Sequence, residues 1–157
     1  MELSIEKDIE RVKIFDEIFE GQTYIFIDRV TETIDGTVFS QLESCFVLKY
    51  DVAVIALAQV ILESELVKLL RENDESPKQY FEKNIDLAWE KELISDQMRQ
   101  FLHETRQNRN EMLHPNDFKD SRFLDLLAIE SLRAVAAFLS FKSDIFYKEL
   151  EKRIQSY

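Results

Sequence analysis

The chain has 157 residues, 45% hydrophobic and 32% charged, so length and composition suit one folded domain over residues 1–157 and exclude intrinsic disorder. It contains two glycines and two prolines, which disfavours sandwiches, barrels and multi-strand sheets because their many turns draw on these residues. The formal net charge of −11 favours solubility and repels the phosphates of nucleic acid. We therefore expect few, long elements.

The first half of the chain predicts three helical segments. Apolar residues recur mostly at three- and four-residue intervals over 3–20, and Gly21 stands where a helix C-terminal glycine belongs. Residues 22–35 mix strand-forming residues with a helical stripe, and we predict a helix because a lone short strand would have no partner. The pattern over 38–71 predicts a buried central helix with a kink or break at Tyr50 and Asp51.

The second half predicts four further helices. A polar stretch, 72–77, ends the central helix, and Pro115 must stop the helix that precedes it. The predicted helices are 78–92, a helix from the cap at Ser95 and Asp96 to about Leu113, 123–141 and 144–155. All elements together predict an all-α, up-and-down helical bundle of about five to seven helices.

Several classes of site and location are disfavoured. Gly21 and Gly36 stand alone, which excludes glycine-rich phosphate-binding loops, and a single Cys45 allows neither an internal disulfide nor a cysteine-based zinc site. We expect no metal and no cofactor. The charged residues 1–8 do not resemble a signal peptide, and the longest apolar run, 52–62, is too short to cross a bilayer. The sequence therefore predicts a cytoplasmic chain that does not enter a membrane.

The segment from Arg109 to Pro115 brings together residue types suited to catalysis. At about 100° per residue, one stripe of its helix is mainly apolar but includes an arginine. The stripe consists of Met98, Leu102, Thr105, Arg109 and Met112. A guanidinium in such a seam is costly unless it is paired or faces a wet cleft. The position of Arg109 therefore indicates a site or a partner surface.

A second, polar stripe of the same predicted helix carries His103, Gln107, Asn110 and His114. We expect His103 to lie on the surface. On a straight helix Arg109 and His114 point about 140° apart, too far to grip one phosphate easily. Two arrangements solve this: Pro115 swings residue 114 off the helical wheel, or two copies of the helix meet in a dimer and line one cleft.

An arginine and a histidine form a minimal set of groups for RNA cleavage. Arginine is permanently charged and binds phosphate through two donors, while histidine exchanges a proton near neutral pH. The base activates the ribose 2′-OH against the adjacent phosphorus, the arginine stabilises the phosphorane, and a 2′,3′-cyclic phosphate results. DNA lacks this hydroxyl, so we do not expect DNA as a substrate.

The stretch from about Cys45 to Pro115 resembles the higher eukaryotes and prokaryotes nucleotide-binding (HEPN) superfamily. The hallmark of that superfamily is R-x4-6-H with a polar residue, often asparagine, after the arginine. Arg109 and Asn110, with His114 after four intervening residues, match it. Residues 58–66 resemble the family's central helix, and residues 91–106 are similar to the lead-in to its motif in bacterial branches.

The resemblance implies an all-α bundle, a homodimer with a composite site, and often metal-independent ribonuclease activity in toxin–antitoxin, antiviral or stress systems. Carried over by position, Arg109 and His114 would be catalytic and Asn110 a supporting polar residue. An antitoxin or another protein would be a partner. One branch has the pattern R-x4-H-x-Y, but this chain has Asn116 at the tyrosine position, so regulation through that tyrosine is not expected.

The same residues have alternative roles that the sequence leaves open. Arg109 could form a salt bridge with Glu104, Glu111 or an acidic neighbouring helix, and His114 could cap the carboxyl end of its helix. A catalytically inactive dimeric module that binds a protein or a nucleotide would suit the acidic composition equally well.

Charge is unevenly distributed along the chain. Between Arg99 and Arg122 five basic and four acidic residues give +1, and the remainder carries −12. A mildly positive cleft in an acidic body could therefore still admit RNA. Glu63 and Glu65, two residues apart on a predicted helix, face different ways, so we expect them to be solvated rather than paired at a site.

Overall fold

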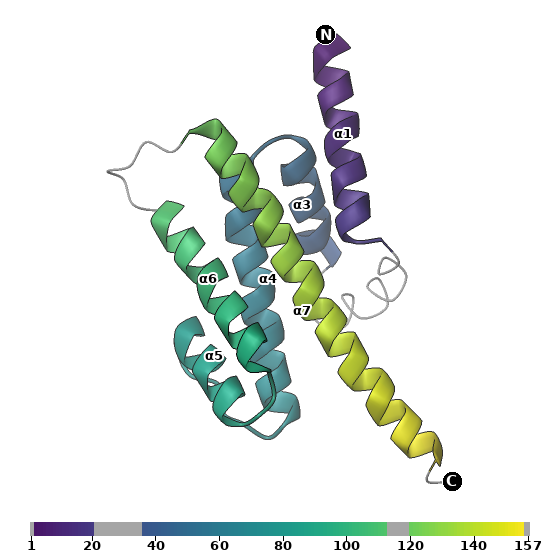
Figure 1. Ribbon diagram of the computed structural model, residues 1–157, viewed down its shortest axis with the longest axis vertical. Helices are drawn as coiled ribbons and strands as arrows, with labels where there is room; N and C mark the ends of the chain where they lie inside the picture. Colours follow the sequence, from purple (N-terminus) through teal and green to yellow (C-terminus); the bar gives the residue numbers. More distant parts are fainter. Residues whose placement is uncertain (1, 21–35, 113–119, 156–157) are drawn as a thin grey trace.

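The computed structural model describes residues 2–20, 36–112 and 120–155, with side chains described over 9–20, 38–112 and 120–144 (Figure 1). Within these ranges six α-helices and no strand are present. They are α1 (Glu2–Ile18), α3 (Gly36–Val47), α4 (Asp51–Glu72), α5 (Phe81–Glu90), α6 (Asp96–Met112) and α7 (Ser121–Gln155). The prediction of an all-α helical bundle is confirmed.

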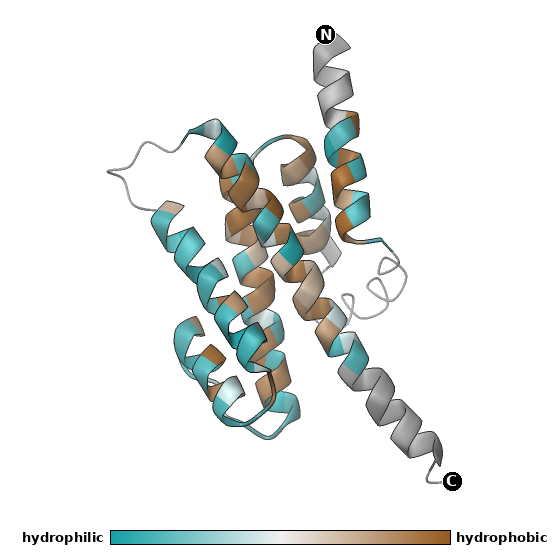
Figure 2. Cartoon of the chain, in the orientation of Figure 1, coloured by the Kyte–Doolittle hydropathy of each residue, from teal (hydrophilic) through white to brown (hydrophobic). Residues whose placement is uncertain are grey.

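Helix α4 is the central element of the bundle and packs against α3, α5, α6 and α7. Helix α6 runs antiparallel to both α4 and α7, while α1 packs against α3 and α7 on the other side (Figure 1). Hydropathy follows this arrangement, since hydrophobic residues dominate α4 whereas α5 and α6 are largely hydrophilic (Figure 2). The predicted buried central helix is therefore confirmed as α4.

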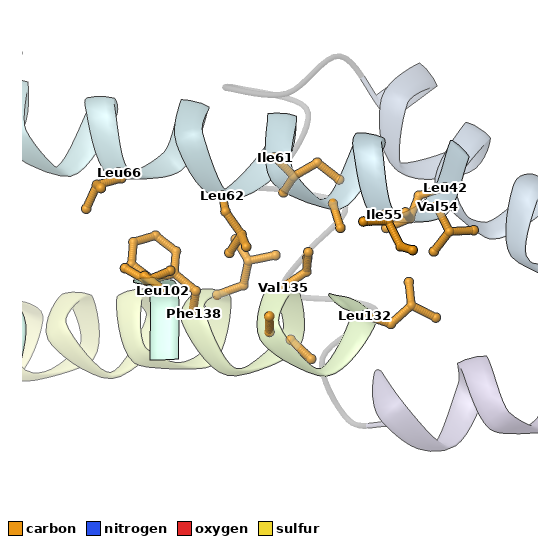
Figure 3. Packing of buried hydrophobic residues seen from close by; sticks show 14 of the residues in the cluster. Leu42, Val54, Ile55, Ile61, Leu62, Leu66, Leu102, Leu132, Val135 and Phe138 are labelled. Carbon is orange, nitrogen blue, oxygen red and sulfur yellow. The ribbon is translucent and has the colours of Figure 1, made fainter. Parts of the chain in front are cut away.

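The core is formed mainly where α4 faces α7. Leu62 and Leu66 of α4 lie near Phe138 of α7, and Leu102 of α6 reaches the same cluster (Figure 3). All four side chains are fully buried. Each such side chain contributes about 1.5–3 kcal/mol through burial of apolar surface. This shared core fixes the position of α6, the helix that carries the predicted site.

The predicted break at Tyr50 and Asp51 is confirmed, because α3 ends at Val47 and α4 begins at Asp51. Two other predicted boundaries need correction. The helix predicted from Lys78 begins at Phe81, because the buried Asn84 side chain hydrogen-bonds both backbone groups of Lys78 and holds it outside the helix. The two predicted C-terminal helices are one, α7, since no glycine or proline interrupts residues 121–155. The helix predicted over 22–35 lies outside the described residues.

Helices α3, α4 and α5 each end in a left-handed cap formed without glycine. Lys49, Asp74 and Glu92 have φ angles of 63°, 59° and 57°. In each case the next residue donates a backbone hydrogen bond of 2.8–3.0 Å to the carbonyl five residues earlier. Glycine is the usual residue at such a cap because it has no Cβ to clash. The chain therefore makes three tight turns that its low glycine content does not predict.

Arg11 is the centre of a buried group of ion pairs that joins distant helices. The Arg11 side chain of α1 donates hydrogen bonds to the carbonyl oxygen of Phe46 at 2.7 Å and to Asp51 at 2.8 Å, and it also contacts Asp125. Its guanidinium lies 4.6 Å from the centre of the Phe46 ring. The same arginine therefore connects α1 to the end of α3, the start of α4 and the start of α7.

Glu65 forms a second buried ion pair. Its carboxylate accepts a hydrogen bond of 2.8 Å from Lys142 of α7, and both side chains are largely removed from solvent. The expectation that Glu65 is solvated is therefore wrong. Its position on α4 points into the α4–α7 contact, where a carboxylate persists because a lysine meets it.

Candidate functional site

Helix α6 begins as the sequence predicts. The Ser95 hydroxyl accepts a hydrogen bond of 3.1 Å from the backbone N–H of Met98, which satisfies one of the free donors at the helix start. Asp96 lies in the first turn, where a negative charge is favourable. The helix ends at Met112, so Arg109 and Asn110 occupy its last turn.

The predicted seam faces the interior of the same chain. Leu102 and Thr105 are buried, while Met98, Arg109 and Met112 are half-buried. Leu102 packs into the core beside Phe138 (Figure 3). Packing within the same chain therefore accounts for the apolar residues in the middle of the stripe. At its end, Arg109 lies at the border between this core and solvent.

Within the part of the chain that the structure describes, Arg109 contacts its neighbour rather than a carboxylate. Its Nη1 atom donates a hydrogen bond of 3.2 Å to Oδ1 of Asn110. Among residues 9–20, 38–112 and 120–144, no carboxylate forms an ion pair with Arg109, so the alternative pairing with Glu104 or Glu111 is not observed. The structure thus brings together two of the three predicted site residues. His114 lies outside the described residues.

Helices α5 and α6 share a polar cluster that the sequence analysis did not identify. Oδ1 of Asp86 accepts hydrogen bonds from Nε and Nη2 of Arg99, at 3.1 and 2.9 Å, and lies 3.2 Å from Nε2 of His103. The Arg99 guanidinium also lies 4.2 Å from the centre of the Trp89 ring. The expectation that His103 belongs to a free surface is corrected, because this residue lies half-buried at the α5–α6 contact.

A second polar contact lies further along the same two helices. Nη1 of Arg106 is 3.5 Å from Oε2 of Glu82. Arg99, His103, Arg106 and Asn110 recur at four-, three- and four-residue intervals, so they share one face of α6. That spacing was a usable signal in the sequence. It identifies a basic face but not the α5 carboxylates that lie opposite.

The cluster makes the stability of the α5–α6 contact depend on pH, because Asp86 is a titratable group. Burial alone would raise the pKa of Asp86, but hydrogen bonds from Arg99 and His103, and the charges of both, hold that pKa below its ordinary value of 3.8. A carboxyl whose pKa is lower in the folded than in the unfolded state stabilises the fold above its unfolded pKa. This contribution is lost as the pH falls through the folded value.

Asp86→Asn is therefore expected to lower the free energy of unfolding by about 1–2 kcal/mol at pH 7, since hydrogen bonds to a charged group are lost. The difference from the unsubstituted protein should begin to shrink near pH 4, where the Asp86 carboxyl of the unfolded chain becomes protonated, and should disappear as the pH falls through the lower pKa of the folded protein. Urea denaturation followed by circular dichroism from pH 7 to pH 3 measures this difference. Glu90→Gln, at an exposed carboxylate of the same helix, should show no such trend. A constant difference at every pH would contradict the assignment.

A separate groove of about 530 Å³ lies between α1 and α7, and no residue of α6 lines it. Its walls are mainly apolar, with Glu17 and Arg133 at the polar positions beside Ser140. Within the described part of the chain, no group of three or more His, Cys, Asp and Glu residues is arranged to hold a metal ion. No helix in that part has the length and apolar content needed to span a membrane.

Comparison of the chain with protein-family models, curated proteins and solved structures finds no match. The features of this chain that bear on function are the half-buried Arg109, its hydrogen bond to Asn110, and the basic face that continues from these residues toward the start of α6.

Proposed function

We propose that this protein is a metal-independent endoribonuclease of the HEPN type, with Arg109, Asn110 and His114 in its active site. The observation that carries the proposal is the state of Arg109. Its guanidinium is half-buried at the carboxyl end of α6, bonded to an amide and not to a carboxylate among the described residues. An arginine whose partner among the described residues is an uncharged amide is suited to bind a phosphate.

In the proposed reaction His114 removes the proton from a ribose 2′-OH, and the resulting oxygen attacks the adjacent phosphorus. Arg109 stabilises the additional negative charge of the phosphorane. The bond to the 5′-oxygen then breaks, this oxygen takes up a proton, and the other product ends in a 2′,3′-cyclic phosphate. Asn110 holds the Arg109 guanidinium through the hydrogen bond between them.

The proposal includes a homodimer whose two copies complete the site. We pair Arg109 of one copy with His114 of the other, the composite arrangement that the resemblance implies. An exposed apolar stripe on α4, formed by Val52, Ala56 and Val60, supports a second copy as the partner. Helix α4 also packs against α6, the helix that holds Arg109. The cellular setting we propose is cytoplasmic, in a toxin–antitoxin, antiviral or stress system.

Incubation of purified protein with RNA in excess EDTA tests the reaction. We expect cleavage products with 2′,3′-cyclic phosphate ends, and loss of cleavage in both His114→Ala and Arg109→Ala. Sedimentation should give twice the mass of the chain. Cleavage that continues unchanged in both variants would falsify the assignment, because a contaminating nuclease would then account for the products.

The alternative is a dimeric interaction module without catalysis. It is favoured by exposed apolar side chains at the α3–α4 corner and the nearby start of α7, which are Leu48, Tyr50, Val52 and Leu126. Together with the net charge of −11, these residues suit a basic protein partner such as an antitoxin. This alternative predicts no RNA turnover and unchanged partner binding in His114→Ala. Co-purification with the variant protein distinguishes it from the enzyme.

A further inference from the structure

Arg11, Arg99 and Arg106 are each largely removed from solvent, and they differ in how well their donors are satisfied. Arg11, with 9% of its side chain exposed, is bonded to a carbonyl and two carboxylates. Arg99, with 34% exposed, donates two hydrogen bonds to Asp86 and stacks on Trp89. Arg106, with 23% exposed, has one carboxylate contact at 3.5 Å, and its buried Nε has no hydrogen-bond partner among the described residues.

The state of Arg106 is unusual because buried donors are nearly always paired. A distance of 3.5 Å is long for a charge-assisted hydrogen bond, which is normally about 2.7–2.9 Å. The partner, Glu82, has 48% of its side chain exposed, so water competes for the carboxylate. The guanidinium therefore keeps most of its capacity to bind an anion that arrives from solvent.

The neighbours of Arg106 add to this capacity. Arg109 follows three residues later and Asn110 four residues later, so both lie on the adjoining turn of α6. Two arginines at this spacing repel each other. Among the described residues Arg109 bonds only the Asn110 amide, and the one carboxylate that meets Arg106 is the half-exposed Glu82 at 3.5 Å. An anion with more than one charged group would relieve this repulsion.

We propose that Arg106 binds a backbone phosphate of single-stranded RNA next to the phosphate held by Arg109. Glu82 contacts this arginine in the free protein and gives way to the RNA. The inference rests on the proposed function for the identity of the ligand, since consecutive phosphodiesters match two guanidinium groups on successive turns. Arg106 acts in binding, whereas Arg109 acts on the phosphorus that reacts.

Binding is measured with a fluorescent RNA that is 2′-O-methylated throughout and therefore resists cleavage, by anisotropy at several salt concentrations. Arg106→Gln is expected to weaken binding by about three- to tenfold and to lower the slope of log K against log salt by about 0.7. Glu82→Gln should tighten binding, because it removes the competing carboxylate. Arg133→Gln on α7, which loses the same charge from an exposed position, should change binding little.

Cleavage assays separate this inference from the proposed function. If Arg106 acts in binding, Arg106→Gln raises KM and leaves kcat nearly unchanged, while His114→Ala abolishes turnover but still binds the methylated RNA. Equal effects of Arg106→Gln and Arg133→Gln on binding, with cleavage still dependent on Arg109, would overturn the inference and leave the function standing. Specific binding through Arg106 without any turnover would overturn the ribonuclease assignment instead.

The Glu82 variant keeps the test decisive if Arg106→Gln unfolds, because it changes an exposed side chain and its predicted effect has the opposite sign. Thermal unfolding identifies any variant that is not folded. An unchanged or weaker affinity in folded Glu82→Gln would also overturn the inference. Free inorganic phosphate as a competitor distinguishes the two sources of the anion, since equal affinity for phosphate and RNA would show that no RNA backbone is recognised.

Discussion

Replacing Arg109 with alanine is expected to lower kcat for RNA cleavage by about 10²–10³-fold, the usual cost of removing a donor that stabilises developing negative charge. The charge on the phosphorane is greater than on the ground-state phosphodiester, so Arg109 contributes more to the transition state than to substrate binding. KM should therefore change much less than kcat. Single-turnover cleavage of a defined RNA measures the chemical step separately from product release.

Two further variants define the role of Arg109. Arg109→Lys keeps the charge but loses the planar pair of donors, so it should recover only part of the activity. Asn110→Ala removes the acceptor that holds the guanidinium at 3.2 Å, and we expect a smaller loss of about tenfold. Arg133→Ala, an exposed arginine of α7, is the matched control. Activity in Arg109→Ala equal to that of the control would contradict the assigned role.

Replacing Arg11 with alanine is expected to lower the free energy of unfolding by about 3–5 kcal/mol, as found when one partner of a buried ion pair is removed. The Asp51 side chain has 14% of its surface exposed and would lose its cation. The Phe46 carbonyl would lose its hydrogen bond from the same arginine. Urea denaturation followed by circular dichroism measures the change.

Lys13→Ala is the control for Arg11→Ala, because it removes a positive charge from an exposed position of the same helix. We expect it to change stability by less than about 0.5 kcal/mol. Equal stabilities of the two variants would show that the contacts of Arg11 do not hold α1 to the bundle. A double substitution with Asp51→Asn should cost less than the two single losses combined, because the carboxylate is then no longer left charged and unpaired.

The sequence predicts the bundle because apolar spacing follows the buried face of each helix. The stripe through Leu102 and Thr105 and the cap at Ser95 needed no knowledge of neighbouring helices, and both are confirmed. The sequence predicts two helices, 123–141 and 144–155, where the structure has one, because no glycine or proline interrupts this stretch.

The candidate site could be predicted only in part, for a related physical reason. Periodicity shows which face of α6 is basic, but Asp86 and Glu82 come from α5 and meet that face only after the two helices pack. The burial of Glu65 likewise depends on Lys142, which lies 77 residues away along the chain. The spacing of residues within one helix does not show which residue of another helix it will meet. Only the three-dimensional structure identifies such contacts.

The corners after α3, α4 and α5 bear on how this protein could be made more robust. Lys49, Asp74 and Glu92 each adopt a backbone conformation that costs a residue with a Cβ on the order of 1 kcal/mol. The rest of the fold offsets that cost. Stabilising changes are therefore available at these solvent-facing bends, away from both the interior and the last turn of α6, and an engineer could add them without touching the residues proposed to handle RNA.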